Sequence, residues 1–152
     1  MEIATLATIG GIAVLLVLSG FFSSSETALT AASRPRMHLL EAKGDKRAEL
    51  VNRLRSEQDS MIGTILLGNN LVNILASALA TSVLISLFGE AGVIYATIAM
   101  TLLVLIFGEI LPKTYAFPHA DRLALTIAPT FLVLVRLLGP VMSSIQYVIR
   151  GV

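Results

Sequence analysis

The sequence contains no cysteine, and this absence excludes two kinds of structure. Disulfide bonds cannot form, and no metal site can be built on thiolate ligands. Charge is scarce as well, since charged side chains make up 14% of the 152 residues and apolar side chains 55%. A soluble domain carries about 25% charged residues. We therefore expect an integral membrane protein.

Long segments without charge mark the expected membrane crossings. They comprise residues 3–25, 60–89 and 91–108. A helix needs about 20 apolar residues to cross the hydrocarbon of a bilayer. We therefore predict an all-α membrane protein, a single transmembrane domain over residues 1–152. Its three transmembrane helices are expected at about 3–30, 60–88 and 91–111, the first of them retained because it lacks the features of a cleaved signal peptide.

The C-terminal region is apolar but interrupted. Two uncharged runs, residues 123–135 and 137–149, are separated by Arg136. Each would span only about 20 Å as a helix. Pro129 and the Gly139-Pro140 pair interrupt them further. We expect juxtamembrane helices at about 118–150, and a fourth, kinked crossing is the alternative.

Lysine and arginine are concentrated in one segment, because seven of the eleven lie within residues 34–55. Cytoplasmic loops of membrane proteins carry such an excess. We therefore place this segment in the cytoplasm, the N-terminus outside and the C-terminus in the cytoplasm. The segment also predicts a helical hairpin at about 34–57, joined at Lys43-Gly44-Asp45 and lying in the membrane interface on anionic headgroups. A specific ligand role for its charges is the alternative.

Polar side chains inside or at the ends of the apolar segments are the candidate functional residues, because they are costly in lipid and need partners. The stretch "SGFFSSSETAL" ends the first predicted helix, "LLGNNLVN" lies within the second, and "FGEILP" ends the third. All three places are expected on the cytoplasmic half. They offer hydroxyl, amide and carboxylate oxygens from Ser23, Ser25, Asn69, Asn70, Asn73 and Glu109.

The stretch "FGEILPK" combines a glycine, a carboxylate and a proline. In an α-helix Pro112 has no N–H for the carbonyl of Gly108, which would be left free beside Glu109. Hard oxygen ligands of this kind suit magnesium, calcium or sodium. A bound cation would also keep a buried carboxylate ionised. Alternatively, Glu109 pairs with Lys113 four residues on, and the serines and asparagines only hold helices together.

At these residues the chain resembles a known family. The stretches "LSGFFSSSETAL", "LLGNNLVNILAS" and "FGEILPKTYA" resemble the three signature stretches of the CorC/CNNM family of magnesium transporters. The resemblance covers the whole chain and corresponds to that family's transmembrane domain. It implies metal ligands at Ser23, Asn69, Asn73, Gly108 and Glu109, with Ser25 and Asn70 beside these positions and a helix break at Pro112.

The resemblance also implies a biological setting. It implies a homodimer in the lipid bilayer of the inner (plasma) membrane, which exports magnesium coupled to sodium entry. Cytosolic CBS domains are expected C-terminal to Val152, outside this sequence. No enzymatic activity and no nucleic-acid partner are expected.

Two functions remain open from the residues. The first is a cation transporter, which needs Glu109 on a water-accessible cavity. The alternative is a membrane anchor and dimerisation module, which would bury Glu109 against Lys113 or another helix. Small residues in the second helix, Ala76, Ser77, Ala80 and Thr81, are expected to form a close dimer contact.

Overall fold

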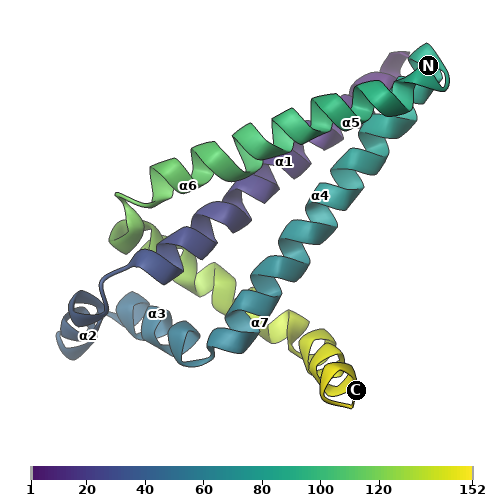
Figure 1. Ribbon diagram of the computed structural model, residues 1–152. Coiled ribbons are helices and arrows are strands. Elements are labelled where there is room, and N and C mark those ends of the chain that lie inside the picture. The colour runs from purple at the N-terminus through teal and green to yellow at the C-terminus, as the bar shows by residue number, and fades with distance from the viewer. Residues whose placement is uncertain (1, 152) are drawn as a thin grey trace. The chain divides into compact units, whose positions relative to one another are not determined.

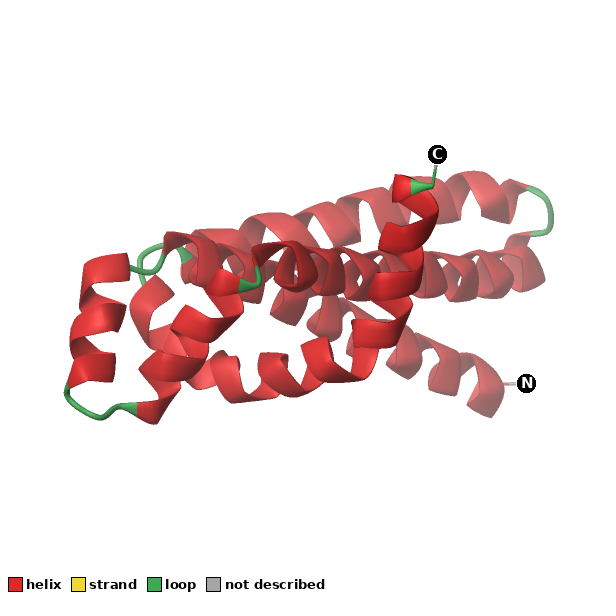
Figure 2. Cartoon of the chain, turned by 90° about the horizontal axis from the view of Figure 1, so that it is seen from below, coloured by secondary structure: helices red, strands yellow, loops and turns green. Residues whose placement is uncertain are grey.

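The structure, a computed structural model, describes residues 2–151 and confirms the all-α class: every regular element within them is a helix (Figures 1 and 2). Met1 and Val152, the two ends whose sides of the membrane are predicted above, lie outside this range. The elements are α1 (Glu2–Ala31), α2 (Arg34–Ala42), α3 (Lys46–Ser56), α4 (Gln58–Phe88), α5 (Ala91–Leu103), the π-helix η1 (Val104–Ile110), α6 (Leu111–Ala116) and α7 (Ala120–Arg150).

Four helical segments are long and apolar enough to cross a membrane. They are Ile3–Ala31, Gln58–Phe88, Ala91–Ala116 and Ala120–Arg150. Large apolar side chains stay exposed along them, for example Ile3, Val17 and Ile74. Such exposed apolar surface suits contact with lipid. The chain is therefore a multi-pass membrane protein, and the number of three crossings stays a prediction.

The C-terminal region differs from the expectation of several interrupted helices. It forms one helix, α7, and both Pro129 and Pro140 lie inside it. Each proline removes one backbone hydrogen bond but need not end a helix whose packing continues. Here the packing does continue, since the buried residues recur every three or four positions across the first proline: Ala120, Ala124, Ala128, Phe131 and Val135. The expected interruptions are therefore wrong.

The described chain divides into two compact units. The first comprises residues 2–24 and 68–114, and the second residues 25–67 and 115–151. In the first unit α4 and α5 are joined by a tight turn (Figure 1). Gly89 has a φ of 69°, and a β-carbon on Gly92 would lie 2.3 Å from the carbonyl of Leu84. Only glycine allows this conformation and this approach without strain.

The core of the first unit changes the expected role of two alanines. Ala76 and Ala80 are 0% and 7% exposed and pack with Met100 of α5. Apolar residues of α1, including Ile12 and Leu15, pack against the same cluster. These two alanines are therefore buried within the chain and are not free to form the predicted contact with a second copy.

The second unit contains the basic hairpin. Ser33 caps α2 by accepting a hydrogen bond from the N–H of Arg36, and Asp45 caps α3 by accepting from Arg47 and Ala48. Between the two helices Gly44 has a φ of 95°. Serine and aspartate are preferred caps because their oxygens satisfy free N–H groups of a first turn. The position of the hairpin formed by α2 and α3 at the membrane surface stays a prediction.

Arg55 connects α3 to the C-terminal end of α1 within the second unit. Its guanidinium donates hydrogen bonds to the carbonyls of Leu29 and Ala32 at the end of α1. Burial lowers the pKa of Arg55 below its ordinary value, nearby Arg34 adds to this effect, and Asp121 opposes it. The charge is kept because the two carbonyls replace part of the water it has lost.

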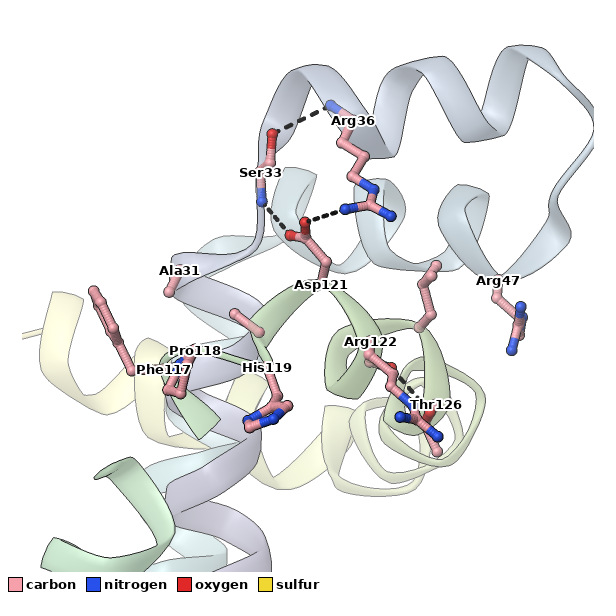
Figure 3. A pocket seen from close by; sticks show the side chains of 12 residues that line it. Ala31, Ser33, Arg36, Arg47, Phe117, Pro118, His119, Asp121, Arg122 and Thr126 are labelled. Carbon is pink, nitrogen blue, oxygen red and sulfur yellow. Dashed lines mark hydrogen bonds and ion pairs between the residues drawn. The ribbon is translucent and has the colours of Figure 1, made fainter. Parts of the chain in front are cut away.

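A cavity of about 800 Å³ lies in the second unit (Figure 3). Arg36, Arg47 and Arg122 line it. Asp121 accepts a hydrogen bond of 2.7 Å from the N–H of Ser33 and lies 3.4 Å from a guanidinium nitrogen of Arg36. These bonds connect α7 to the start of α2, and the arginines leave the walls of the cavity predominantly basic.

Candidate functional site

Three glycines of the first unit allow its helices to approach one another closely. A β-carbon on Gly20 of α1 would lie 3.2 Å from the carbonyl oxygen of Phe107, and one on Gly68 of α4 would lie 2.5 Å from the ring of Phe22. A β-carbon on Gly108 of η1 would lie 2.7 Å from the hydroxyl of Ser19. Small residues permit such contacts between membrane helices. They bring the polar groups of α1, α4 and η1 together.

A chain of hydrogen bonds connects these three helices. Ser19 Oγ donates to Asn69 Oδ1 at 3.1 Å, and Asn73 Nδ2 donates to the same oxygen at 3.4 Å. Asn69 Nδ2 in turn donates to Glu109 Oε1 at 3.4 Å. Asn69 therefore occupies the centre of the cluster, and its orientation is set from both sides.

Glu109 also forms the ion pair considered above. Its Oε2 lies 3.3 Å from Lys113 Nζ, and the two side chains are 33% and 45% exposed. The same carboxylate lines a groove of about 590 Å³ between α4 and α5. Glu109 thus lines a cavity, as expected for a transporter, and it also pairs with Lys113, as expected for an anchor.

Two buried oxygen atoms of the first unit have no hydrogen-bond partner: Ser23 Oγ and Asn73 Oδ1. Ser23 is 1% exposed and lies one helical turn beyond Ser19 on α1, and Asn73 lies one turn beyond Asn69 on α4. A buried polar atom without a partner is costly, and most such atoms in proteins are satisfied. A cation beside either oxygen would satisfy it without requiring a donor.

The helix around Gly108 differs from the α-helix assumed above. Residues 104–110 form a π-helix, and the N–H of Leu111 donates to the carbonyl of Ile106, five residues back. If this register continued to Pro112, the carbonyl left without a donor would be that of Phe107, so the α-helical argument for Gly108 does not apply here. Gly108 as a metal ligand stays a prediction. Ser24 Oγ donates to the carbonyl of Pro112 at 3.4 Å, which adds a further contact with α1.

Asn70 and Ser25 are the remaining predicted residues. Asn70 is exposed. Ser25 is 1% exposed and belongs to the second unit. Ser19 was missed by the sequence reasoning, although its spacing of four from Ser23 places both on one face of α1.

The composition of the cluster limits the ions it suits. Within residues 2–151 no three histidine, cysteine, aspartate or glutamate side chains gather in one place. The cluster instead combines one carboxylate, Glu109, with neutral oxygens of serine and asparagine. Oxygen ligands of this kind fit magnesium, calcium or sodium and do not favour zinc or copper.

Comparison with known proteins extends over most of the chain. Residues 10–152 match the family described as the cyclin M transmembrane N-terminal domain. The UPF0053 inner membrane protein YfjD of Escherichia coli is 44% identical over 107 residues, which cover 70% of this chain and 25% of that protein. A UPF0053 protein of Haemophilus influenzae is 43% identical over 111 residues, with coverage of 73% and 26%.

A plant relative is similar over a longer stretch. A chloroplastic DUF21 domain-containing protein of Arabidopsis thaliana is 37% identical over 141 residues, which cover 93% of this chain and 21% of that protein. The chain thus spans about a quarter of the length of these relatives, or less.

Proposed function

Since the chain belongs to the cyclin M transmembrane domain family, we propose that it transports magnesium across the membrane and binds the ion at the cluster around Glu109. The observation that carries the proposal is the pair of buried, unpartnered oxygens on Ser23 and Asn73. They belong to the same unit as the carboxylate, and they are ligands of the kind that magnesium prefers.

Each residue of the cluster has a distinct part in this proposal. Glu109 supplies the negative charge, and Ser23, Asn69 and Asn73 supply neutral oxygens. Ser19 holds the amide of Asn69 in place through their hydrogen bond. Magnesium takes about six oxygens in an octahedron and loses water reluctantly, so backbone carbonyls such as that of Gly108, or remaining waters, complete the set.

Lys113 acts as the competitor of the cation. Without magnesium its ammonium group neutralises Glu109. An exposed pair at this spacing contributes only about 0.3 to 0.5 kcal/mol, so a divalent ion displaces the lysine at little cost. The exchange keeps the carboxylate paired throughout, because one cation replaces another.

The wider setting completes the proposal. The transporter works as a homodimer in the inner (plasma) membrane, with its N-terminus outside and the hairpin of α2 and α3 on the cytoplasmic surface. It exports magnesium and takes up sodium. Further cytosolic domains follow this one in the whole protein.

The alternative function is that of a membrane anchor and dimerisation module. The ion pair between Glu109 and Lys113 favours it, since that pair satisfies the carboxylate without any bound ion. In an anchor the cluster would only hold α1, α4 and η1 together.

The substitution Glu109→Gln tests the proposed site, because it keeps the shape of the side chain and removes its charge. Because Glu109 is the carboxylate of the cluster, we expect magnesium affinity to fall at least tenfold when its charge is removed, which corresponds to about 1.4 kcal/mol. Calorimetric titration with MgCl₂ and uptake into vesicles measure the effect. Glu57→Gln, the same change at an exposed residue, is the matched control. Equal binding and transport in Glu109→Gln and the parent protein would contradict the proposal.

A further inference from the structure

The groove between α4 and α5 has an unusual lining for a surface formed by two uncharged helical segments. Its walls include apolar residues such as Ile74 and Met100. Six of its lining residues are polar: Asn73, Ser77 and Thr81 from α4, and Thr97, Thr101 and Glu109 from α5 and η1.

The polar residues form one row on each helix. On α4 the row repeats every four residues, and on the facing side Thr97 and Thr101 are also four apart. Residues at this spacing lie on one face of a helix. Both helices therefore turn polar residues toward the same cavity, and Glu109 lines it further along the chain than Thr101, with Leu105 between them.

The threonine hydroxyls expose acceptors to the groove. Each donates its hydrogen to the carbonyl one turn earlier: Thr81 to Ser77 at 2.8 Å, Thr97 to Val93 at 2.8 Å and Thr101 to Thr97 at 2.5 Å. A hydroxyl with its hydrogen committed retains only lone pairs for other partners. Such oxygens can bind a cation or accept hydrogen bonds from the waters around it, and they have no hydrogen to donate to an anion.

The groove is long enough to matter for transport. Asn73 and Thr81 are eight residues apart on α4, which corresponds to about 12 Å along an α-helix. The hydrocarbon of a bilayer is about 30 Å thick. The row on α4 thus covers about two fifths of that distance, in the direction of the turn between α4 and α5.

We propose that this groove is the path of the transported cation between Glu109 and the turn of α4 and α5, with the hydroxyl oxygens of Ser77, Thr81, Thr97 and Thr101 as successive acceptors for the hydrated ion. The inference rests on the magnesium transport proposed above and adds to it the route and its residues. An ion at membrane depth without such acceptors would meet a large desolvation penalty.

Single cysteines test whether the groove holds water, and the chain has no cysteine of its own. Ser77→Cys and Thr101→Cys place a thiol in the groove. Ile98→Cys and Leu102→Cys are the controls. Both residues lie on α5 with Thr101 and are more than half exposed, but they do not line the groove. Protein in lipid vesicles is treated with a small cationic methanethiosulfonate.

We expect the groove thiols to react rapidly and magnesium to slow them, because only a hydrated thiol forms the reactive thiolate. The two control thiols should stay nearly unreactive in lipid. Groove thiols that react as slowly as the controls would overturn the proposal, since lipid or a second copy of the chain would then fill the groove.

The double substitution Thr97→Val and Thr101→Val tests the route, because it removes two hydroxyls and keeps the side-chain shape. We expect the transport rate in vesicles to fall at least tenfold while the magnesium affinity measured by titration changes less than twofold. Thr8→Val is the control, since Thr8 makes the same type of hydrogen bond, to Ala4, and lies outside the groove. Unchanged transport would overturn the route, whereas absence of magnesium binding in the parent protein would overturn the proposed function itself.

Discussion

The hydroxyl of Ser19 lies 2.7 Å from the point that a β-carbon on Gly108 would occupy. This hydroxyl also donates to Asn69, the central residue of the polar cluster. The contact between α1 and η1 is therefore as close as glycine permits. The position of Glu109 therefore depends on Ser19 and Gly108, because their contact holds η1 beside α1 and Ser19 also orients Asn69, which donates to Glu109.

Gly108→Ala should disturb this contact. The added methyl group would push against Ser19, and overpacking of this kind costs about 1 to 3 kcal/mol. We expect thermal unfolding in detergent to show a loss of stability in that range. Gly10→Ala is the control, because no atom lies within 4 Å of its β-carbon position and alanine favours a helix. A Gly108→Ala protein as stable as the parent would contradict the observed approach.

A second substitution should relieve the strain. Ser19→Ala removes the hydroxyl at 2.7 Å, and the next atom, the β-carbon of residue 19, lies at an ordinary 3.5 Å. The double variant should therefore unfold at a higher temperature than Gly108→Ala alone. Its magnesium affinity should nevertheless stay below that of the parent protein, since Asn69 has lost its donor. A double variant no more stable than the single one would show that the strain lies elsewhere.

Lys113→Met should separate the transporter from the anchor. The substitution removes the ammonium that pairs with Glu109, a contribution of about 0.5 kcal/mol. In the transporter, magnesium affinity should rise about twofold in a calorimetric titration. Lys43→Met, an exposed lysine of the hairpin, removes the same charge and should change nothing. A loss of stability without any magnesium binding would favour the anchor.

Arg55→Ala should weaken the second unit. It leaves the carbonyls of Leu29 and Ala32 without the donors they have in the folded protein. Hydrogen bonds to a charged group contribute about 1.5 to 3 kcal/mol, and we expect a loss of this size in thermal unfolding. Arg53→Ala, an exposed residue of the same helix, should cost less than 0.5 kcal/mol. Equal losses in the two variants would mean that the carbonyl contacts contribute nothing.

The predicted orientation can be tested at two turns. Lys43→Cys lies in the hairpin and Glu90→Cys in the turn between α4 and α5, and both avoid the glycines with positive φ. An impermeant thiol reagent applied from outside should label position 90 and leave position 43 unlabelled, because the basic hairpin is expected in the cytoplasm. The reverse pattern would invert the topology.

The sequence predicts features that depend on local chemistry. The joint of the hairpin is predicted at Lys43-Gly44-Asp45, and the structure has a turn there between α2 and α3. The candidate residues of α4 and η1 could be identified because amides and a carboxylate are rare in apolar helices. Asn69 and Glu109 indeed lie within one chain of hydrogen bonds.

Other features depend on packing that no local pattern reveals. The spacing of Ser19 from Ser23 places it on the same face of α1, but only the structure shows its contact with Gly108 and its hydrogen bond to Asn69. The π-helix requires a register that residues 104–110 do not signal by composition. The continuity of α7 through Pro129 depends on its buried face, which compensates for the missing hydrogen bond. Only the structure therefore reveals the contact of Ser19, the π-helix and the continuity of α7.

The contact of Arg55 with the end of α1 also sets an order for the biogenesis of the protein. The last carbonyls of a helix have no partner within it, and here Ala32 receives its donor from a residue 23 positions later. At about 5 to 20 residues per second, the ribosome adds Arg55 roughly 1 to 5 s after Ala32. The first helix can enter the membrane early, but its C-terminal end is completed only when the hairpin has been synthesised.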